Sequence, residues 1–158
     1  KGFKELVELG WIEDKMPRMV SVQSTGCAPI VRAWEGGDEF AEYWEDAETI
    51  SSGIRVPSAL GDFMILEAVR SSGGFAISVT DEQTLEIQHQ IGLSEGLLLC
   101  PEGAATVAAY RDSLESGLVS SDETVVLFNT ATGLKYPMPE VISNIDKNNF
   151  EYSVFKTK

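Results

Sequence analysis

Two hydroxyl side chains follow an apolar run near the end of the sequence. Thr130 and Thr132 come directly after residues 125–129, and Gly133 closes the segment. A threonine hydroxyl both donates and accepts hydrogen bonds without carrying charge, which suits a ligand nitrogen or oxygen at the end of a strand. The same residues commonly close a strand as an N-cap or an ST turn, so their spacing leaves both interpretations open.

Other residue types that carry chemistry are few. The single histidine, His89, lies in a predicted helix, where we expect it to be solvated or partly buried. Cys27 precedes a predicted helix, but no second histidine is present to activate a thiol, so a small buried cysteine is the better interpretation. Cys27 and Cys100 lack the Cys-x-x-Cys spacing. The sequence therefore predicts no metal site, no disulfide and a reducing, cytoplasmic setting.

Composition narrows the class of protein further. The 158 residues include 25 acidic and 12 basic side chains, giving a formal net charge of −13, and 43% of the residues are hydrophobic. The hydrophobic content favours one globular domain over a disordered chain. The negative charge argues against binding to nucleic acid or to an anionic membrane, because both need clustered Lys and Arg. The longest apolar runs are far shorter than the roughly 20 residues of a membrane-spanning helix.

Short β-rich runs alternate with helical patterns along the chain. The predicted strands are residues 19–23, 75–79, 97–100 and 125–129. Helical patterns begin at residues 1, 29, 57, 81 and 101. This alternation predicts an α/β fold of three layers, in which a mostly parallel sheet is flanked by helices. Ligands of such sheets bind beyond the carboxyl ends of the strands, where the Thr130 segment lies.

Local signals predict how the helices begin and pack. Ser24 or Thr25 is expected to cap the helix that starts near Pro29, and Thr80 with Gln83 has the pattern of a capping box. The helix from residue 101 has a face of small side chains, which would let it approach a sheet or another helix closely. These side chains are Ala104, Ala105, Ala108 and Ala109.

Three regions define the predicted organisation of the chain. Residues 1–136 form one α/β domain, and residues 137–158 are a tail with no assigned structure. Within the domain, residues 38–52 are acidic and irregular. We expect this stretch to be a solvated surface excursion with a few aromatic side chains beneath it.

Four segments, in this order and with these separations, resemble the carboxyl-terminal part of the threonine synthase family. They are residues 22–31, 49–57, 101–105 and 129–136. The Pro-Glu-Gly-Ala-Ala and Thr-Ala-x-Gly-Leu-Lys runs form the most specific pair, and the resemblance covers residue 1 to about residue 136. Members of this family are pyridoxal-phosphate enzymes with the tryptophan-synthase-β-like fold, called fold type II. The resemblance implies that the chain is part of the same fold.

The resemblance also implies an activity and two cofactor contacts. The activity would convert O-phosphohomoserine and water to threonine and phosphate by β,γ-replacement, with pyridoxal 5'-phosphate as cofactor and a small amino acid as substrate. Thr130 matches the position whose hydroxyl bonds to the pyridine nitrogen of the cofactor. Unlike an Asp, a neutral hydroxyl does not force that nitrogen to stay protonated, which suits elimination and replacement chemistry. Cys100 matches a position that lines the cofactor ring and is often acidic in related dehydratases.

Some parts of the family pattern are missing from these residues. The Schiff-base lysine and the Gly-rich phosphate loop would lie upstream, in the amino-terminal half, and Lys135 is not the matching lysine. We therefore expect no catalytic residue in this chain and no activity from it alone. Strand edges that should pair with the amino-terminal half predict a partner: that half itself, or another copy of the chain in a homo-oligomer.

Two further functions stay open at this point. One is a different reaction on the same cofactor, as in a threonine or serine dehydratase or another fold type II lyase. The other is a non-catalytic α/β module that binds a ligand and shares only the sheet with these enzymes. The cofactor contact at Thr130 separates the second function from the first, because a non-catalytic module has no need of it.

Overall fold

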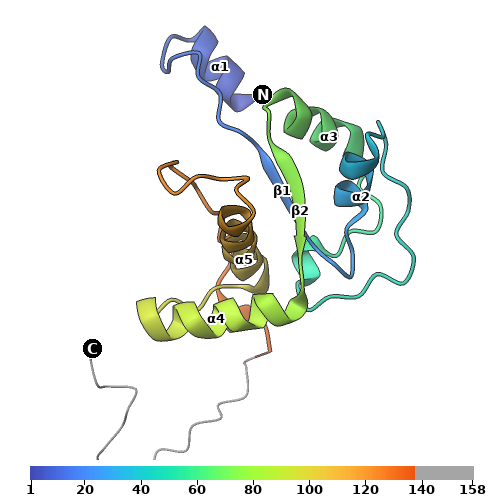
Figure 1. Cartoon of the computed structure of the whole chain (residues 1–158), viewed down its shortest axis with the longest axis vertical. Coiled ribbons are helices and arrows are strands. Elements are labelled where there is room, and N and C mark those ends of the chain that lie inside the picture. The colour runs from blue at the N-terminus through green and yellow to red at the C-terminus, as the bar shows by residue number, and fades with distance from the viewer. Residues whose placement is uncertain (138–158) are drawn as a thin grey trace, which may run out of the picture.

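The computed structural model describes residues 1–137, and Figure 1 shows their arrangement. The helices and strands are α1 (Gly2–Glu8), β1 (Val20–Ser24), α2 (Pro29–Gly36), α3 (Asp62–Ser71), β2 (Phe75–Val79), α4 (Asp81–Glu95) and α5 (Pro101–Glu115). Two 3-10 helices are η1 (Ser52–Ile54) and η2 (Gly133–Lys135). The predicted tail, residues 137–158, lies outside the described residues except for residue 137.

β1 and β2 form a parallel pair between two layers of helices. Their register pairs Val20 with Phe75 and Ser24 with Val79. Both α2 and α5 contact both strands, and Figure 1 shows α5 on one side of the sheet with α2 and α3 on the other. This arrangement confirms the predicted α/β fold, in which helices flank a parallel sheet.

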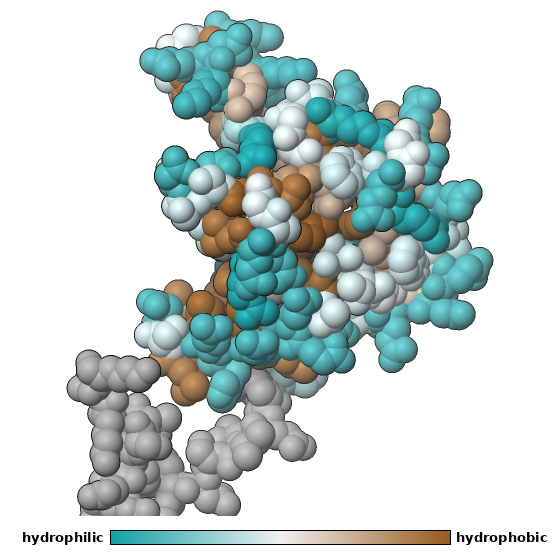
Figure 2. Space-filling model, in the orientation of Figure 1, coloured by the Kyte–Doolittle hydropathy of each residue, from teal (hydrophilic) through white to brown (hydrophobic). Residues whose placement is uncertain are grey.

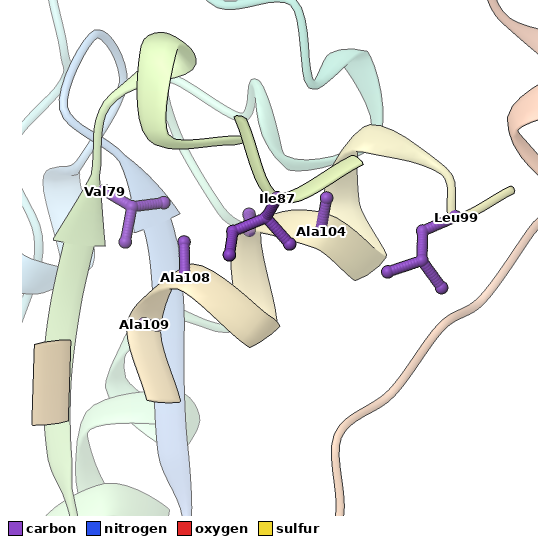
Figure 3. Close-up of a cluster of buried hydrophobic side chains, with 7 residues drawn as sticks. Val79, Ile87, Leu99, Ala104, Ala108 and Ala109 are labelled. Carbon is purple, nitrogen blue, oxygen red and sulfur yellow. The ribbon is translucent and has the colours of Figure 1, made fainter. Parts of the chain in front are cut away.

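The alanine face of α5 forms the main core beside the sheet. Ala104, Ala105 and Ala108 are fully buried, and they cluster with Val79 of β2 and Ile87 of α4 (Figure 3). Because methyl side chains are short, α5 packs close to both α4 and the sheet. The predicted role of this small face is confirmed.

The start of α4 follows its predicted capping box. The Gln83 N–H donates to the Thr80 hydroxyl at 3.1 Å, and the Thr80 N–H donates to the Gln83 side-chain oxygen at 2.8 Å. This reciprocal pair satisfies two N–H groups that the helix itself leaves unpaired. It fixes the direction in which the chain leaves β2.

The start of α2 differs from the prediction. Its N-cap is Ala28, whose side chain offers no hydrogen bond, so neither Ser24 nor Thr25 caps it. The buried Gln23 side chain of β1 accepts instead from the N–H groups of residues 30 and 31, at 2.8 and 3.1 Å. A long side chain from the strand replaces a local hydroxyl, because β1 runs beside the first turn of α2.

Two predicted strands are absent from the described part of the chain. Leu99 makes only an isolated antiparallel bridge with Thr132, and residues 125–129 have no strand pairing. The predictions at 97–100 and 125–129 were therefore wrong for this chain. A β-rich run becomes a strand only when a neighbour completes its hydrogen-bonded ladder, and for these runs residues 1–137 supply only the single Leu99–Thr132 bridge.

The region before α3 is also less helical than predicted. The helix starts at Asp62, not at Pro57, whose carbonyl accepts from the Trp44 N–H at 3.0 Å. The Asp62 carboxylate then accepts from the Ala41 N–H at 2.7 Å. Residues 38–51 are thus a non-helical excursion whose start is held against α3 by the Ala41–Asp62 bond. Arg32 lies 4.8 Å over the Trp44 ring.

None of the helices within residues 1–137 has both the length and the apolar character needed to cross a membrane.

Candidate functional site

The carboxyl end of the sheet is tied together by one aspartate. Asp81, at the first position of α4, accepts from the Ser24 hydroxyl at 3.2 Å and from the Thr49 hydroxyl at 2.5 Å. It also accepts from the Ile50 N–H at 2.9 Å. A carboxylate in the first turn of a helix is favoured by the helix dipole. Asp81 therefore fixes residues 49 and 50 at the end of both strands.

A second group of contacts surrounds the start of α5. Cys100 is the N-cap of α5 and is fully buried. Its sulfur accepts from the Gly103 N–H at 3.3 Å, and its thiol donates to the Asn129 side-chain oxygen at 3.3 Å. The Cys100 N–H donates to the same Asn129 oxygen. The end of the apolar run is thereby attached to the first turn of α5.

Glu102 lies one residue further into α5 and has little exposed surface. Its carboxylate accepts from the Gly53 N–H at 2.6 Å and from the Tyr136 hydroxyl at 2.7 Å. Burial raises the pKa of this carboxyl, but the hydrogen bonds from Tyr136 and from backbone N–H groups outweigh it and lower the pKa. The carboxylate in turn raises the pKa of the Tyr136 hydroxyl. The pair is therefore a phenol donating to an ionised carboxylate.

Thr130 sits between these anchors. It is exposed, it follows the tethered Asn129, and it precedes Thr132, whose hydroxyl accepts from the Leu134 N–H at 3.3 Å. The Gly133 N–H donates to the Leu98 carbonyl at 3.0 Å. The backbone on both sides of Thr130 is thus fixed, and its exposed side chain carries an uncharged hydroxyl that can donate and accept hydrogen bonds.

The structure joins the two predicted contact residues through a third that sequence reasoning missed. Asn129 links them: its side chain is hydrogen-bonded to Cys100, and it immediately precedes Thr130 in the sequence. Glu102 was also missed. In the sequence, Asn129 is a polar residue at the end of an apolar run, and Glu102 is an acid at the start of a helix. Both patterns are also common where residues only end a strand or begin a helix, so neither marks a functional site by itself.

Other predicted candidates take structural roles. Cys27 is fully buried, and burial raises the pKa of its thiol, as expected for an inert small residue. His89 is exposed on α4. Both interpretations made from the sequence are confirmed.

Comparison with known proteins shows which family the chain belongs to. Residues 1–131 match the protein family described as "Pyridoxal-phosphate dependent enzyme". The chain belongs to this family. Pyridoxal phosphate is thus the family's cofactor, and the resemblance found in the sequence is confirmed.

The curated relatives of this chain include several threonine synthases. Those of Methanosarcina acetivorans and Methanocaldococcus jannaschii are 39% and 36% identical over 137 residues, 87% of this chain and 34% of each relative. Cysteate synthase of Methanothrix thermoacetophila is 30% identical over 138 residues, 82% of this chain and 33% of the relative. The chain spans about a third of the length of these relatives.

A solved structure gives the same fold. The crystal structure of a threonine deaminase from T.th. matches with a TM-score of 0.50 at 23% identity, over 64% of this chain and 35% of that chain. At this level of identity the likeness concerns the fold alone, and it confirms the predicted fold class.

The donor set at the exit of residues 125–129 fits the family's cofactor. An aromatic heterocycle with one ring nitrogen needs a single donor or acceptor at its edge, held in a fixed place. Thr130 offers one exposed neutral hydroxyl on backbone that is anchored on both sides. The Asn129 amide and the buried Cys100 thiol that bonds to it support this position.

Proposed function

We propose that this chain forms one wall of the active site of a threonine synthase. The reaction would convert O-phosphohomoserine and water to threonine and phosphate. The observation that carries this proposal is the 36–39% identity to threonine synthases over 87% of the chain. The fixed and exposed hydroxyl of Thr130 supports it independently.

In this proposal Thr130 holds the edge of the cofactor ring. When bound, pyridoxal phosphate supplies an electron sink for bonds that break next to the amino group of the substrate. The Thr130 hydroxyl would bond to the ring nitrogen without a charge of its own, so that it does not impose a proton there. Because Asn129 and Gly133 are anchored, the hydroxyl needs little reorganisation to make this contact.

Cys100 is proposed to line the same ring from behind. Its thiol donates to Asn129 and accepts from Gly103, and the side chain is fully buried in this chain, so it would support this wall of the site from beneath Asn129. An acidic side chain in this buried position would add a charge where the present network has none. This difference favours a synthase over the related dehydratases.

The remaining residues of the site would come from the other two thirds of the protein. We propose that residues 1–158 do not catalyse the reaction by themselves, because the lysine that attaches the cofactor and the loop that binds its phosphate lie in the amino-terminal part. That part, with an amino-acid substrate, is the partner that the chain requires. The unpaired Cys27 and Cys100 support the further expectation of a cytoplasmic protein.

A matched pair of variants tests the proposal in the complete protein. Thr130→Val removes the proposed ring contact, whereas Thr132→Val removes a hydroxyl two residues away that only supports η2. We expect Thr130→Val to weaken cofactor binding and slow phosphate release from O-phosphohomoserine, and Thr132→Val to leave cofactor affinity nearly unchanged. Equal cofactor affinity in Thr130→Val and the parent protein would remove Thr130 from the site and favour a non-catalytic module.

A second candidate is a different reaction on the same cofactor. The observation that favours this candidate is the 30% identity to a cysteate synthase. Parallel assays of the complete protein with O-phosphohomoserine, threonine and serine as substrates, together with a test for cysteate formation, separate these activities. Turnover of threonine or serine without turnover of O-phosphohomoserine would establish a dehydratase instead of a threonine synthase.

A further inference from the structure

We propose that Glu102 is a positioning residue that holds Thr130 in place through Tyr136. The same carboxylate ties the η1 turn to the start of α5, so one side chain aligns two walls of the site. This inference rests on the proposed function where it concerns the cofactor. Its structural part, the fixing of residues 129–136, stands on the contacts alone.

The first argument is that both oxygens of Glu102 are used. One accepts from the Gly53 N–H at 2.6 Å, and the other accepts from the Tyr136 hydroxyl at 2.7 Å. The residue is only 9% exposed, and its position in the first turn of α5 favours the negative charge. Gly53 and Tyr136, which lie 49 and 34 residues from Glu102 in the sequence, thus both bond to its carboxylate. Such a group holds together segments that are distant in the sequence.

The second argument is that the joined segments approach too closely for ordinary side chains. A Cβ added at Gly53 would lie 2.8 Å from the Glu102 oxygen, and one added at Gly133 would lie 2.6 Å from the Leu99 carbonyl oxygen. Both distances are shorter than normal contacts between these atoms. Glycine at these two positions allows η1 and η2 to lie directly against α5 and the residues before it.

The third argument concerns what else holds the Thr130 segment. Residues 125–129 have no strand pairing within the described chain, so a sheet does not orient them. Within residues 1–137 the anchors are Asn129 on Cys100 at one end, the Leu99–Thr132 bridge and Gly133 on the Leu98 carbonyl in the middle, and Tyr136 on Glu102 at the other end. Among the described residues, Tyr136 is therefore the anchored residue furthest along the chain after Thr130.

The chemistry of the pair suggests an informative set of variants. In Tyr136→Phe the Glu102 carboxylate loses one donor while staying charged and nearly buried. In Glu102→Gln the side-chain oxygen can still accept from the Gly53 N–H, and its amide can donate to the Tyr136 oxygen. The bond between residues 102 and 136 then survives with its direction reversed. Tyr136→Phe should therefore disturb the Thr130 segment, whereas Glu102→Gln should largely preserve it.

The experiment uses the complete protein, with two measurements on each variant. One is hydrogen–deuterium exchange of residues 129–136 in the cofactor-free protein, and the other is the affinity for pyridoxal phosphate measured by absorbance titration. We expect Tyr136→Phe to speed exchange in this segment and to weaken cofactor affinity about tenfold, the scale of one hydrogen bond to a charged group. Glu102→Gln should stay within about threefold of the parent protein on both measurements.

The outcomes separate this inference from the proposed function. Unchanged exchange and unchanged cofactor affinity in Tyr136→Phe would overturn the positioning role, even if the variant melts at a lower temperature. If Thr130→Val also leaves cofactor affinity unchanged, the Thr130 contact fails as well, and the exchange result still decides whether Glu102 fixes the segment. If Tyr136→Phe does not fold, the double variant with Glu102→Gln removes the unpaired charge, and the same two measurements then decide.

Discussion

The side-chain oxygen of Asn129 accepts hydrogen bonds from both the N–H and the thiol of Cys100, each at 3.3 Å. A single amide thus satisfies two donors at the buried start of α5. It also fixes the residue immediately before Thr130. The packing of α5 and the position of the proposed cofactor contact consequently depend on the same side chain.

Replacing Asn129 should therefore destabilise the protein and not only affect its chemistry. Asn129→Ala leaves the N–H and thiol of the buried Cys100 without their acceptor. We expect the free energy of unfolding to fall by about 1–3 kcal/mol, the cost of leaving buried polar groups unpaired. Chemical denaturation of the complete protein measures this, with Gln90→Ala on the exposed side of α4 as the control. Equal losses in both variants would contradict the assigned role.

The first turn of α5 gives a second prediction, at Gly103. A Cβ added to this residue would run into the Asn129 side chain, so Asn129 would have to move away from Cys100. Gly103→Ala should therefore lower the free energy of unfolding by about 1–3 kcal/mol, although alanine is the better helix former.

Gly92 in α4 provides the matched control for Gly103. A Cβ there would meet only the Leu97 carbonyl oxygen, at 4.0 Å, so alanine fits without strain. Gly92→Ala should raise the free energy of unfolding by up to about 1 kcal/mol. A stabilised Gly103→Ala variant would show that Asn129 is not confined as the structure indicates.

The success of the sequence predictions depended on how local each signal was. Thr80 and Gln83 are three residues apart and specify the start of α4 by themselves, so their capping box was predictable. The cap of α2 was not, because Gln23 reaches it from a neighbouring strand. The link between Glu102 and Tyr136 crosses 34 residues and depends on how α5 and η2 pack, which no short-range pattern contains.

The failed strand predictions have a related physical cause. Residues 125–129 have the apolar, β-branched composition of a buried strand, and their pairing partner is not among the described residues. Composition selects residues that suit a strand, but hydrogen bonds to a neighbour create one. The predicted contact residues Thr130 and Cys100 remain predictions, since only a cofactor measurement tests them.

The Glu102 carboxyl gives a pH-dependent prediction. Its pKa is lower in the folded protein than in the unfolded chain. As the pH falls, the carboxyl is therefore protonated in the unfolded chain before it is protonated in the folded protein. The stabilisation is present above the unfolded pKa of about 4.3 and is lost as the pH falls through the lower folded value. Below about pH 4.3, Glu102→Gln should therefore lose less free energy of unfolding than the parent protein does.

Denaturation at a series of pH values between neutral and strongly acidic measures this difference. Glu42→Gln, on the exposed acidic stretch, is the control for the change in net charge. Parallel loss of stability in Glu102→Gln and the parent protein would mean that the carboxylate is not held by Gly53 and Tyr136 in solution.

The last prediction concerns association of the isolated chain. Val126 and Phe128 are 75% and 72% exposed on a segment with β-strand composition and no pairing, and Figure 2 shows apolar surface around α5 on the face drawn there. Residues 1–158 should therefore self-associate when produced alone, and they should form a defined complex when co-expressed with the amino-terminal part of the same protein.

Sedimentation velocity over a range of concentrations tests this, with a Val126→Lys, Phe128→Lys double variant as the comparison. We expect the parent chain to show concentration-dependent larger species and the charged variant to show fewer, because charge on an exposed strand opposes pairing. The parent chain and the double variant should both keep the circular dichroism signal of helices, since the side chains of Val126 and Phe128 lie outside the core. A parent chain that stays monomeric at every concentration would contradict this prediction. It would mean that residues 125–128 do not need a neighbouring strand from another chain or from the amino-terminal part.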